Sequence, residues 1–140
     1  MEFFKQVGKL ALGSRVRFLA DMITQDAFKI YSDYQTNLHP KWFPVFYVLS
    51  KFKGNSVTEI AQKIGHSHVS VSKIIAEMMK AGLIVEKSDL NDRRRTEITL
   101  SKMGKAIAQK IELQYKDVNA AIEEVSTQAK HNLWAAIEEW

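Results

Sequence analysis

The stretch 56-SVTEIAQKIGHSHVSVSKIIAEMMKAGLIVEKSDLNDRRRTEITLS-101 begins with two short helical patterns. Residues 56–59 read Ser-Val-Thr-Glu, which is a capping-box signal for the start of a helix, and Gly65 is placed to end that helix. Ser67 is a favourable N-cap for a second helix, which Gly82 ends. The pattern predicts two short helices joined by a tight turn.

The segment after Gly82 changes from helical to alternating periodicity. Residues 83–87 are mainly apolar, and residues 96–100 alternate between polar and apolar side chains, so both predict strands. Residues 88–93 between them have the composition of a turn. We therefore expect an antiparallel hairpin directly after the helix pair, which together form a winged helix-turn-helix.

Long amphipathic segments flank this unit on both sides. Apolar residues recur three and four positions apart up to Tyr34, and we expect the first long helix to begin near Ser14. The same spacing runs from Lys102 to about Val125, and Ser126 is expected to start a final helix. The predicted fold class is therefore mainly α with a small β-hairpin.

We expect residues 1–140 to form a single domain. Residues 38–101 would make up the winged-helix lobe, and the long helices would lie in residues 1–37 and 102–140. The apolar faces of those helices are larger than one small lobe can cover. Pairing with a second copy of the chain would bury them, so we expect a homodimer.

Composition narrows the classes of function. The chain has 140 residues, of which 46% are hydrophobic and 26% are charged, as in folded globular proteins. It has no cysteine, which excludes disulfides, thiolate metal sites and cysteine nucleophiles. It has neither a transmembrane run of about 18 apolar residues nor the apolar core of a signal peptide, so we expect a cytoplasmic protein that does not contact a membrane.

Positive charge is concentrated in the middle third of the chain. The formal net charge is +4, and residues 51–95 hold nine Lys or Arg against five acids, whereas the rest of the chain is balanced. Three of these cations, Arg93, Arg94 and Arg95, follow the expected turn of the hairpin. A polyanion such as nucleic acid fits this charge as a partner, although many proteins without such a partner carry as much.

The sequence contains no signature of catalysis. It lacks a nucleophile–base set, paired catalytic carboxylates and a phosphate-binding glycine loop, so we expect no enzymatic activity and no cofactor. Of the four histidines, His66 and His68 are two residues apart, whereas His39 and His131 are remote. No acidic residue joins them at the spacing of metal ligands, so we expect no metal site.

Residues 38–110 resemble the MarR family of bacterial transcriptional regulators. The most specific matches are Gly82-Leu83, Asp92-Arg93-Arg94, Leu100-Ser101 and Gly104. The resemblance implies a dimeric regulator that binds a pseudo-palindromic site in double-stranded DNA. A recognition helix at about 67–81 would lie in the major groove and a wing at 88–96 in the minor groove.

A narrower resemblance concerns the segments FFKQVGKLALGSRVRFLAD and HPKWFPVF. They are similar to a MarR subgroup that is often fused to a GNAT-type acetyltransferase domain. Because nothing follows Trp140, we expect no acetyltransferase in this chain, which is either a short family member or a truncated form. Two alternatives stay open: a winged helix that docks proteins instead of DNA, and the regulatory half of such a fusion.

The expected DNA-facing residues lie on the second helix and on the wing. The apolar face of the helix must point to the core, which leaves an opposite and N-terminal surface of small polar side chains and one cation, suited to a major groove. These residues are Ser67, His68, Val69, Ser70, Ser72 and Lys73. On the wing, the resemblance implies that Arg94 reaches the DNA and that Asp92 braces it, with Arg93 and Arg95 as supporting charge.

A group of aromatic residues has two interpretations. Its members are Tyr31, Tyr34, His39, Trp42, Phe43 and Phe46. The resemblance implies a site for a small aromatic ligand, often an anion, between the DNA-binding lobe and the dimer helices. The alternative, which we favour, is that these side chains are plain core.

Overall fold

The computed structural model of the protein describes residues 2–88, 96–128 and 132–139. In chain order the elements are α1 (Glu2–Val7), η1 (Gly8–Ala11, a 3-10 turn), α2 (Leu12–Asp33), η2 (Pro40–Trp42, also 3-10), α3 (Phe43–Lys51), α4 (Val57–Ile64), α5 (His68–Lys80), β1 (Ile84–Ser88), β2 (Thr96–Leu100), α6 (Lys102–Gln128) and α7 (Leu133–Glu138). This mainly helical chain with one antiparallel hairpin confirms the predicted fold class.

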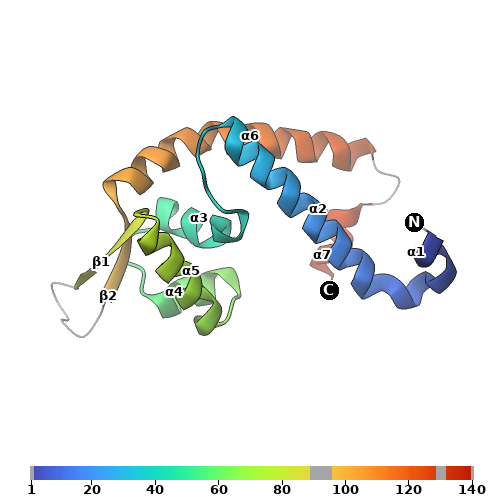
Figure 1. Cartoon of the computed structure of the whole chain (residues 1–140), viewed down its shortest axis with the longest axis horizontal. Helices are drawn as coiled ribbons and strands as arrows, with labels where there is room; N and C mark the ends of the chain where they lie inside the picture. Colours follow the sequence, from blue (N-terminus) through green and yellow to red (C-terminus); the bar gives the residue numbers. More distant parts are fainter. Residues whose placement is uncertain (1, 89–95, 129–131, 140) are drawn as a thin grey trace.

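The molecule is elongated, with a lobe at one end and an arm at the other (Figure 1). The lobe contains α3, α4, α5 and the hairpin. The arm consists of the long helices α2 and α6, which extend from the lobe, together with α1 and α7 at the far end. None of the described helices is long and apolar enough to cross a membrane.

The starts of α4 and α5 follow from the residues immediately before them. Ser56 Oγ accepts from the Glu59 backbone N–H at 3.3 Å, and Glu59 Oε2 accepts from the Ser56 N–H at 2.7 Å, which completes the predicted capping box. Gly65 ends α4 with φ +67°, a left-handed conformation that glycine adopts without a steric penalty. Ser67 Oγ then accepts from the Ser70 N–H at 3.2 Å and begins α5. The predicted helix-turn-helix is therefore present.

We expect Ser56→Ala to lower the free energy of unfolding by about 1 kcal/mol, because the Glu59 backbone N–H at the start of α4 loses its acceptor and the Glu59 carboxylate loses the Ser56 hydroxyl. Chemical denaturation followed by circular dichroism would measure it. Thr58→Ala, at an exposed position in the same turn, is the matched control and should change stability by less than about 0.5 kcal/mol. Equal effects of the two substitutions would show that the capping box contributes nothing specific.

The hairpin forms the wing and is joined to the lobe at its base. β1 pairs antiparallel with β2 in a register that sets Ile84 opposite Leu100 and Ser88 opposite Thr96. Ile98 also donates its N–H to the Asn55 carbonyl at 2.8 Å, so the connection between α3 and α4 pairs with the free edge of β2. The sequence did not indicate this third pairing, which fixes the hairpin to the helix pair.

Four helices and one strand contribute large buried side chains to the core of the lobe. Its largest fully buried side chains include Phe46, Ile60, Met78, Ile98 and Ile111, contributed by α3, α4, α5, β2 and α6. The first helix of the arm contributes little: α2 has 22 residues, of which only Tyr31 is buried.

Hydrogen bonds and close packing around Ser101 join the wing to α6. Ser101 donates its N–H to the Leu83 carbonyl at 2.9 Å and its hydroxyl to the Gly82 carbonyl at 2.6 Å, and its Oγ accepts from the Gly104 N–H at 3.0 Å. Gly104 packs so closely on this junction that a β-carbon there would lie 2.1 Å from the Leu83 oxygen. Ser101 and Gly104 of the Leu-Ser-x-x-Gly sequence thus attach the start of α6 to Gly82 and Leu83, which follow α5.

The ends of the long helices differ from the expectation. The first long helix begins at Leu12, slightly before Ser14, and α6 continues to Gln128, so the prediction that Ser126 starts a new helix was wrong. No glycine or proline interrupts the chain there, and serine is tolerated inside a helix that is already formed. The final helix starts at Leu133, where the Asn132 side chain accepts from the Ala135 N–H at 3.1 Å.

Candidate nucleic-acid interface

The predicted recognition residues lie together on the exposed side of α5. Val71, Ile75 and Met78 are buried and hold the helix on the core. Ser67, His68, Val69, Ser70 and Lys73 are exposed, and Ser72 is half-buried. The six residues predicted on this helix therefore form one continuous surface at its N-terminal end.

The side chains of this surface offer several kinds of contact. Val69 is 78% exposed, although burial would be favourable for its apolar side chain, so it is available for a contact outside the lobe. Ser72 Oγ lies 3.4 Å from His68 Nδ1, one helical turn away, and both groups can donate or accept hydrogen bonds. Among the described residues, Lys73 has no ion-pair partner within 4.0 Å. The surface can therefore offer an apolar contact, hydrogen bonds and a positive charge to DNA.

The predicted wing residues Asp92, Arg93, Arg94 and Arg95 lie outside the described residues. The strands that carry them are described, and the pair Ser88 and Thr96 forms the end of the hairpin remote from the core. In Figure 1 the hairpin projects from the lobe at the end of the molecule opposite the arm.

The described part of the chain contains no group of three or more His, Cys, Asp or Glu side chains that could hold a metal ion. His66 Nδ1 lies 2.9 Å from the Ile64 carbonyl, in the turn between the two helices. His131 lies outside the described residues.

The structure divides the predicted aromatic group. Phe46 is fully buried in the core of the lobe, whereas Tyr31 and Phe43 line a cavity. Tyr34 donates its hydroxyl to Asp117 Oδ2 at 2.5 Å and so joins the end of α2 to α6; this hydrogen bond, followed by burial, raises the pKa of Tyr34. The other two members, His39 and Trp42, lie next to each other with ring centroids 5.8 Å apart.

The cavity has a volume of about 870 Å³ and lies where α2, α3 and α6 meet. Gln114 and Tyr115 are among its lining residues, and their polar atoms Gln114 Oε1 and the Tyr115 hydroxyl are buried without a hydrogen-bond partner among the described residues. Burial raises the pKa of the Tyr115 hydroxyl above its ordinary value. Cations also reach the wall, namely Lys41, Lys51 and Lys116, and Lys51 is paired with Glu112. The cavity therefore offers apolar walls and positive charge, and two unpartnered polar atoms are buried in the side chains that line it.

The sequence analysis did not identify Gln114, although the sequence contains a signal for it. The apolar residues Ile107, Ile111 and Val118 recur along one side of α6, and Gln114 falls three positions after Ile111 on that side. A polar residue within an apolar stripe is buried by its position in the helix, and a buried amide requires partners.

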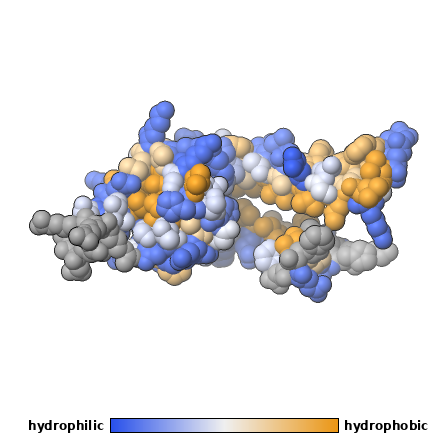
Figure 2. Space-filling view, turned by 90° about the horizontal axis from the view of Figure 1, so that it is seen from below, coloured by the Kyte–Doolittle hydropathy of each residue, from blue (hydrophilic) through white to orange (hydrophobic). Residues whose placement is uncertain are grey.

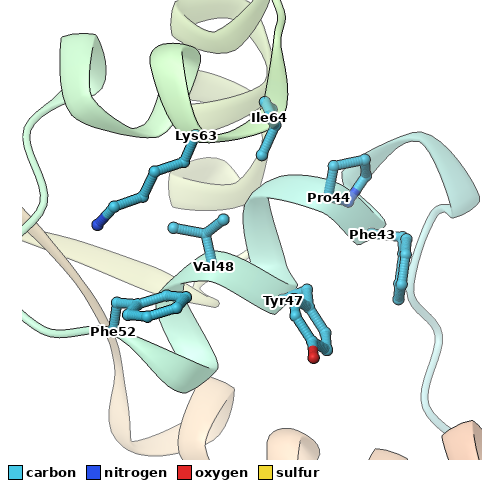
Figure 3. A pocket seen from close by; sticks show the side chains of 7 residues that line it. All are labelled: Phe43, Pro44, Tyr47, Val48, Phe52, Lys63 and Ile64. Atoms are coloured by element: carbon cyan, nitrogen blue, oxygen red, sulfur yellow. The ribbon is translucent and has the colours of Figure 1, made fainter.

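A second, smaller hollow lies between α3 and α4 (Figure 3). Its volume is about 480 Å³, and its lining includes the aromatic side chains of Phe43, Tyr47 and Phe52. The cation on its rim, Lys63, is already engaged: its Nζ lies 4.8 Å from the centroid of the Phe52 ring and donates to Asn55. This hollow is therefore less suited to a polar ligand than the larger cavity.

Comparison with known proteins defines the class of fold. The structure superposes on a MarR/EmrR family transcriptional regulator from Acinetobacter sp. ADP1 with a TM-score of 0.70 and 18% identity, covering 95% of this chain and 93% of that chain. It matches the M. tuberculosis transcriptional regulator MOSR in complex with DNA with a TM-score of 0.68 and 21% identity, over 90% and 86% of the two chains. The S. aureus MepR–DNA complex gives a TM-score of 0.58 and 16% identity, over 82% and 93%. The fold is thus the winged-helix fold of these regulators.

The MarR family model matches residues 36–95, which include the helix pair and the first strand of the wing. No curated protein matches the chain. The family match supports the resemblance to MarR regulators, whereas the narrower resemblance to acetyltransferase fusions stays a prediction.

Proposed function

We propose that this protein is a MarR-type transcriptional regulator that binds double-stranded DNA as a homodimer, with α5 in the major groove and the wing in the minor groove. The observation that carries the proposal is the exposed surface from Ser67 to Lys73 on the second helix of a winged-helix fold. Two of the similar structures, the regulators MOSR and MepR, are complexes with DNA, which supports the same use of this surface here.

The exposed apolar surface of the arm supports the proposal of a homodimer. Hydrophobic side chains gather at the end of the molecule away from the lobe (Figure 2). Leu10 is 93% exposed, and Leu12, Val16 and Phe18 nearby are also exposed. A contiguous apolar surface of this kind is typical of a protein interface, and a second copy of the same arm is the partner that makes a symmetric dimer. Two lobes would then read two half-sites about one helical turn of DNA apart.

We further propose that a small aromatic ligand binds in the cavity between the arm and the lobe. Tyr31, Phe43 and Tyr115 supply aromatic walls, and the lining also includes Gln114, whose buried Oε1 has no partner among the described residues. The volume of about 870 Å³ suits a small molecule. Ligand binding would then shift the population of lobe orientations and so change the affinity for DNA.

Selection of bound sites from a pool of random DNA tests the main proposal. We expect a pseudo-palindromic site whose affinity falls with salt, with a slope that steepens by about 0.9 for each phosphate contact, and a dimer by light scattering. A monomer, or an affinity independent of salt, would contradict the proposal. Failure to select any DNA would favour a winged helix that docks proteins.

We expect Gln114→Leu to leave the free energy of unfolding unchanged or to raise it by up to about 1 kcal/mol, because the substitution removes a buried acceptor that has no partner among the described residues. Thermal unfolding at a fixed protein concentration would measure the change. Gln109→Leu, at an exposed position of the same helix, is the control and should have little effect. A loss of more than about 1 kcal/mol for Gln114→Leu would show that its amide is satisfied in solution and would remove the main support for the ligand site.

A further inference from the structure

One acidic residue at the end of α5 receives two donors from the short segment that follows the arm. Glu77 Oε2 accepts a hydrogen bond from Trp42 Nε1 at 2.9 Å and lies 2.7 Å from Lys41 Nζ. Lys41 and Trp42 belong to η2, and Glu77 lies in the last turn of α5. We call these three residues the Glu77 clamp.

The Glu77 clamp is connected to the arm through His39. The ring of His39 packs edge-on against Phe28 of α2, with centroids 4.8 Å apart, and lies next to Trp42. His39 Nδ1 accepts from the Lys41 backbone N–H at 3.2 Å, which fixes the start of η2. A continuous series of contacts therefore runs from α2 of the arm through η2 to α5.

Lys41 is also one of the residues that line the cavity. Its ammonium group pairs with Glu77. Of the other two lysines on the wall, Lys51 is paired with Glu112, and Lys116 has no ion-pair partner among the described residues. Lys41 is therefore the cavity residue that makes a direct electrostatic contact with the proposed recognition helix.

The pair between Lys41 and Glu77 is weak enough to be exchanged. Their side chains are 46% and 31% exposed, and ion pairs with such access to water contribute little. The long lysine side chain can rotate without disturbing the backbone of η2. A negative charge in the cavity would also attract the Lys41 ammonium group, and apolar walls around that charge reduce its screening by water.

We propose that Lys41 is a regulatory switch that pairs with Glu77 in the free protein and with the anionic group of an aromatic ligand when the cavity is occupied. The ligand removes the Lys41 ion pair from Glu77, which keeps its hydrogen bond from Trp42 and the attraction of Lys73 on its own helix, and so loosens the connection between α5 and the arm. This inference deepens the proposed function and rests on it for the effect on DNA. The exchange of partners by Lys41 does not depend on DNA.

The test uses the whole chain, 4-hydroxybenzoate as the anionic probe and 4-hydroxybenzamide as its neutral counterpart. The indole N–H resonance of Trp42, assigned by its loss in Trp42→Phe, reports on the Glu77 clamp directly. We expect 4-hydroxybenzoate to shift this resonance in a saturable way and 4-hydroxybenzamide to leave it in place. A resonance that does not respond to 4-hydroxybenzoate, or that responds equally to both probes, would overturn the proposal.

Variants separate the switch from general disturbance of the fold. Lys41→Met should abolish the shift of the Trp42 resonance, whereas Lys116→Met, which removes another cavity lysine, should retain it at saturating probe. Glu77→Gln should tighten binding of 4-hydroxybenzoate by up to about five-fold, because Lys41 is no longer shared. An unchanged affinity in Glu77→Gln would contradict the proposal. Circular dichroism would establish that each variant is folded.

The consequence for DNA is measured separately. By linkage, 4-hydroxybenzoate should weaken DNA binding of the parent protein and have no effect on DNA binding of Lys41→Met. An equal effect on both proteins would overturn the regulatory role of Lys41. If the protein binds no DNA under any condition, the proposed function fails, and the Trp42 resonance still decides whether Lys41 exchanges partners.

Discussion

Replacing Gly104 with alanine is expected to lower the free energy of unfolding by about 2–4 kcal/mol. The added β-carbon would lie 2.1 Å from the Leu83 oxygen and 3.1 Å from the Leu83 carbonyl carbon, both of which are backbone atoms. The Leu83 carbonyl is held in place because it accepts from the Ser101 N–H. It cannot move away without breaking the junction between the wing and α6, so α6 itself would have to shift. Urea denaturation of the purified variant would measure the loss.

Gly13→Ala is the matched control for this prediction. Gly13 lies in α2, and apart from its chain neighbours and its own helix backbone no heavy atom lies within 4 Å of the position that a β-carbon would take. An alanine side chain therefore meets open space there. Alanine also favours a helix over glycine, and we expect the control to leave stability unchanged or to raise it by up to about 1 kcal/mol. If Gly104→Ala were as stable as the parent protein, this result would contradict the close packing of α6 on Leu83.

The parts of the fold that could be predicted from the sequence depend on residues close together in the chain. The capping box joins Ser56 to a residue three positions later, and Gly65 ends the helix through its own backbone conformation. The hairpin follows from alternation over five residues in each strand. Such signals are local, and the structure confirms them.

The contacts that the sequence did not reveal join distant residues. Trp42 and Glu77 are 35 positions apart, and either residue alone reads as an ordinary aromatic or a solvated acid. Asn55 is fully buried because its carbonyl pairs with Ile98 of the wing, a contact that exists only after the lobe has folded. The aromatic group could not be divided between cavity and core for the same reason, since the positions of Phe46 and Tyr31 depend on how α2 and α3 meet.

The candidate DNA interface was predictable only in part. The exposed side of α5 follows from the helical period once Val71, Ile75 and Met78 are assigned to the core. The roles assigned to the wing arginines depend on the family resemblance, because a run of three cations in a turn has no unique role. Their assignment therefore needs an experiment.

Replacing Arg94 with alanine is expected to weaken binding to the selected DNA site by about 1–3 kcal/mol, and to leave the free energy of unfolding within about 0.5 kcal/mol of the parent value. Arg94 lies outside the described residues, so the prediction rests on the Asp-x-Arg motif and on the hairpin that carries it. A guanidinium group is planar and weakly hydrated, and a narrow minor groove with its negative potential attracts it. Fluorescence anisotropy at two salt concentrations would measure the affinity.

Two further substitutions distinguish a groove contact from a general contribution of charge. Arg94→Lys keeps the charge but loses the planar group, so a groove contact predicts a loss close to that of Arg94→Ala, whereas simple attraction to phosphate predicts near-normal binding. Arg93→Ala removes the same charge from the adjacent position, to which the resemblance assigns only supporting charge. We therefore expect a smaller loss from Arg93→Ala, with a reduction of about 0.9 in the salt slope if this arginine contacts a phosphate. Equal losses from Arg93→Ala and Arg94→Ala, with normal binding by Arg94→Lys, would show that the wing contributes only positive charge.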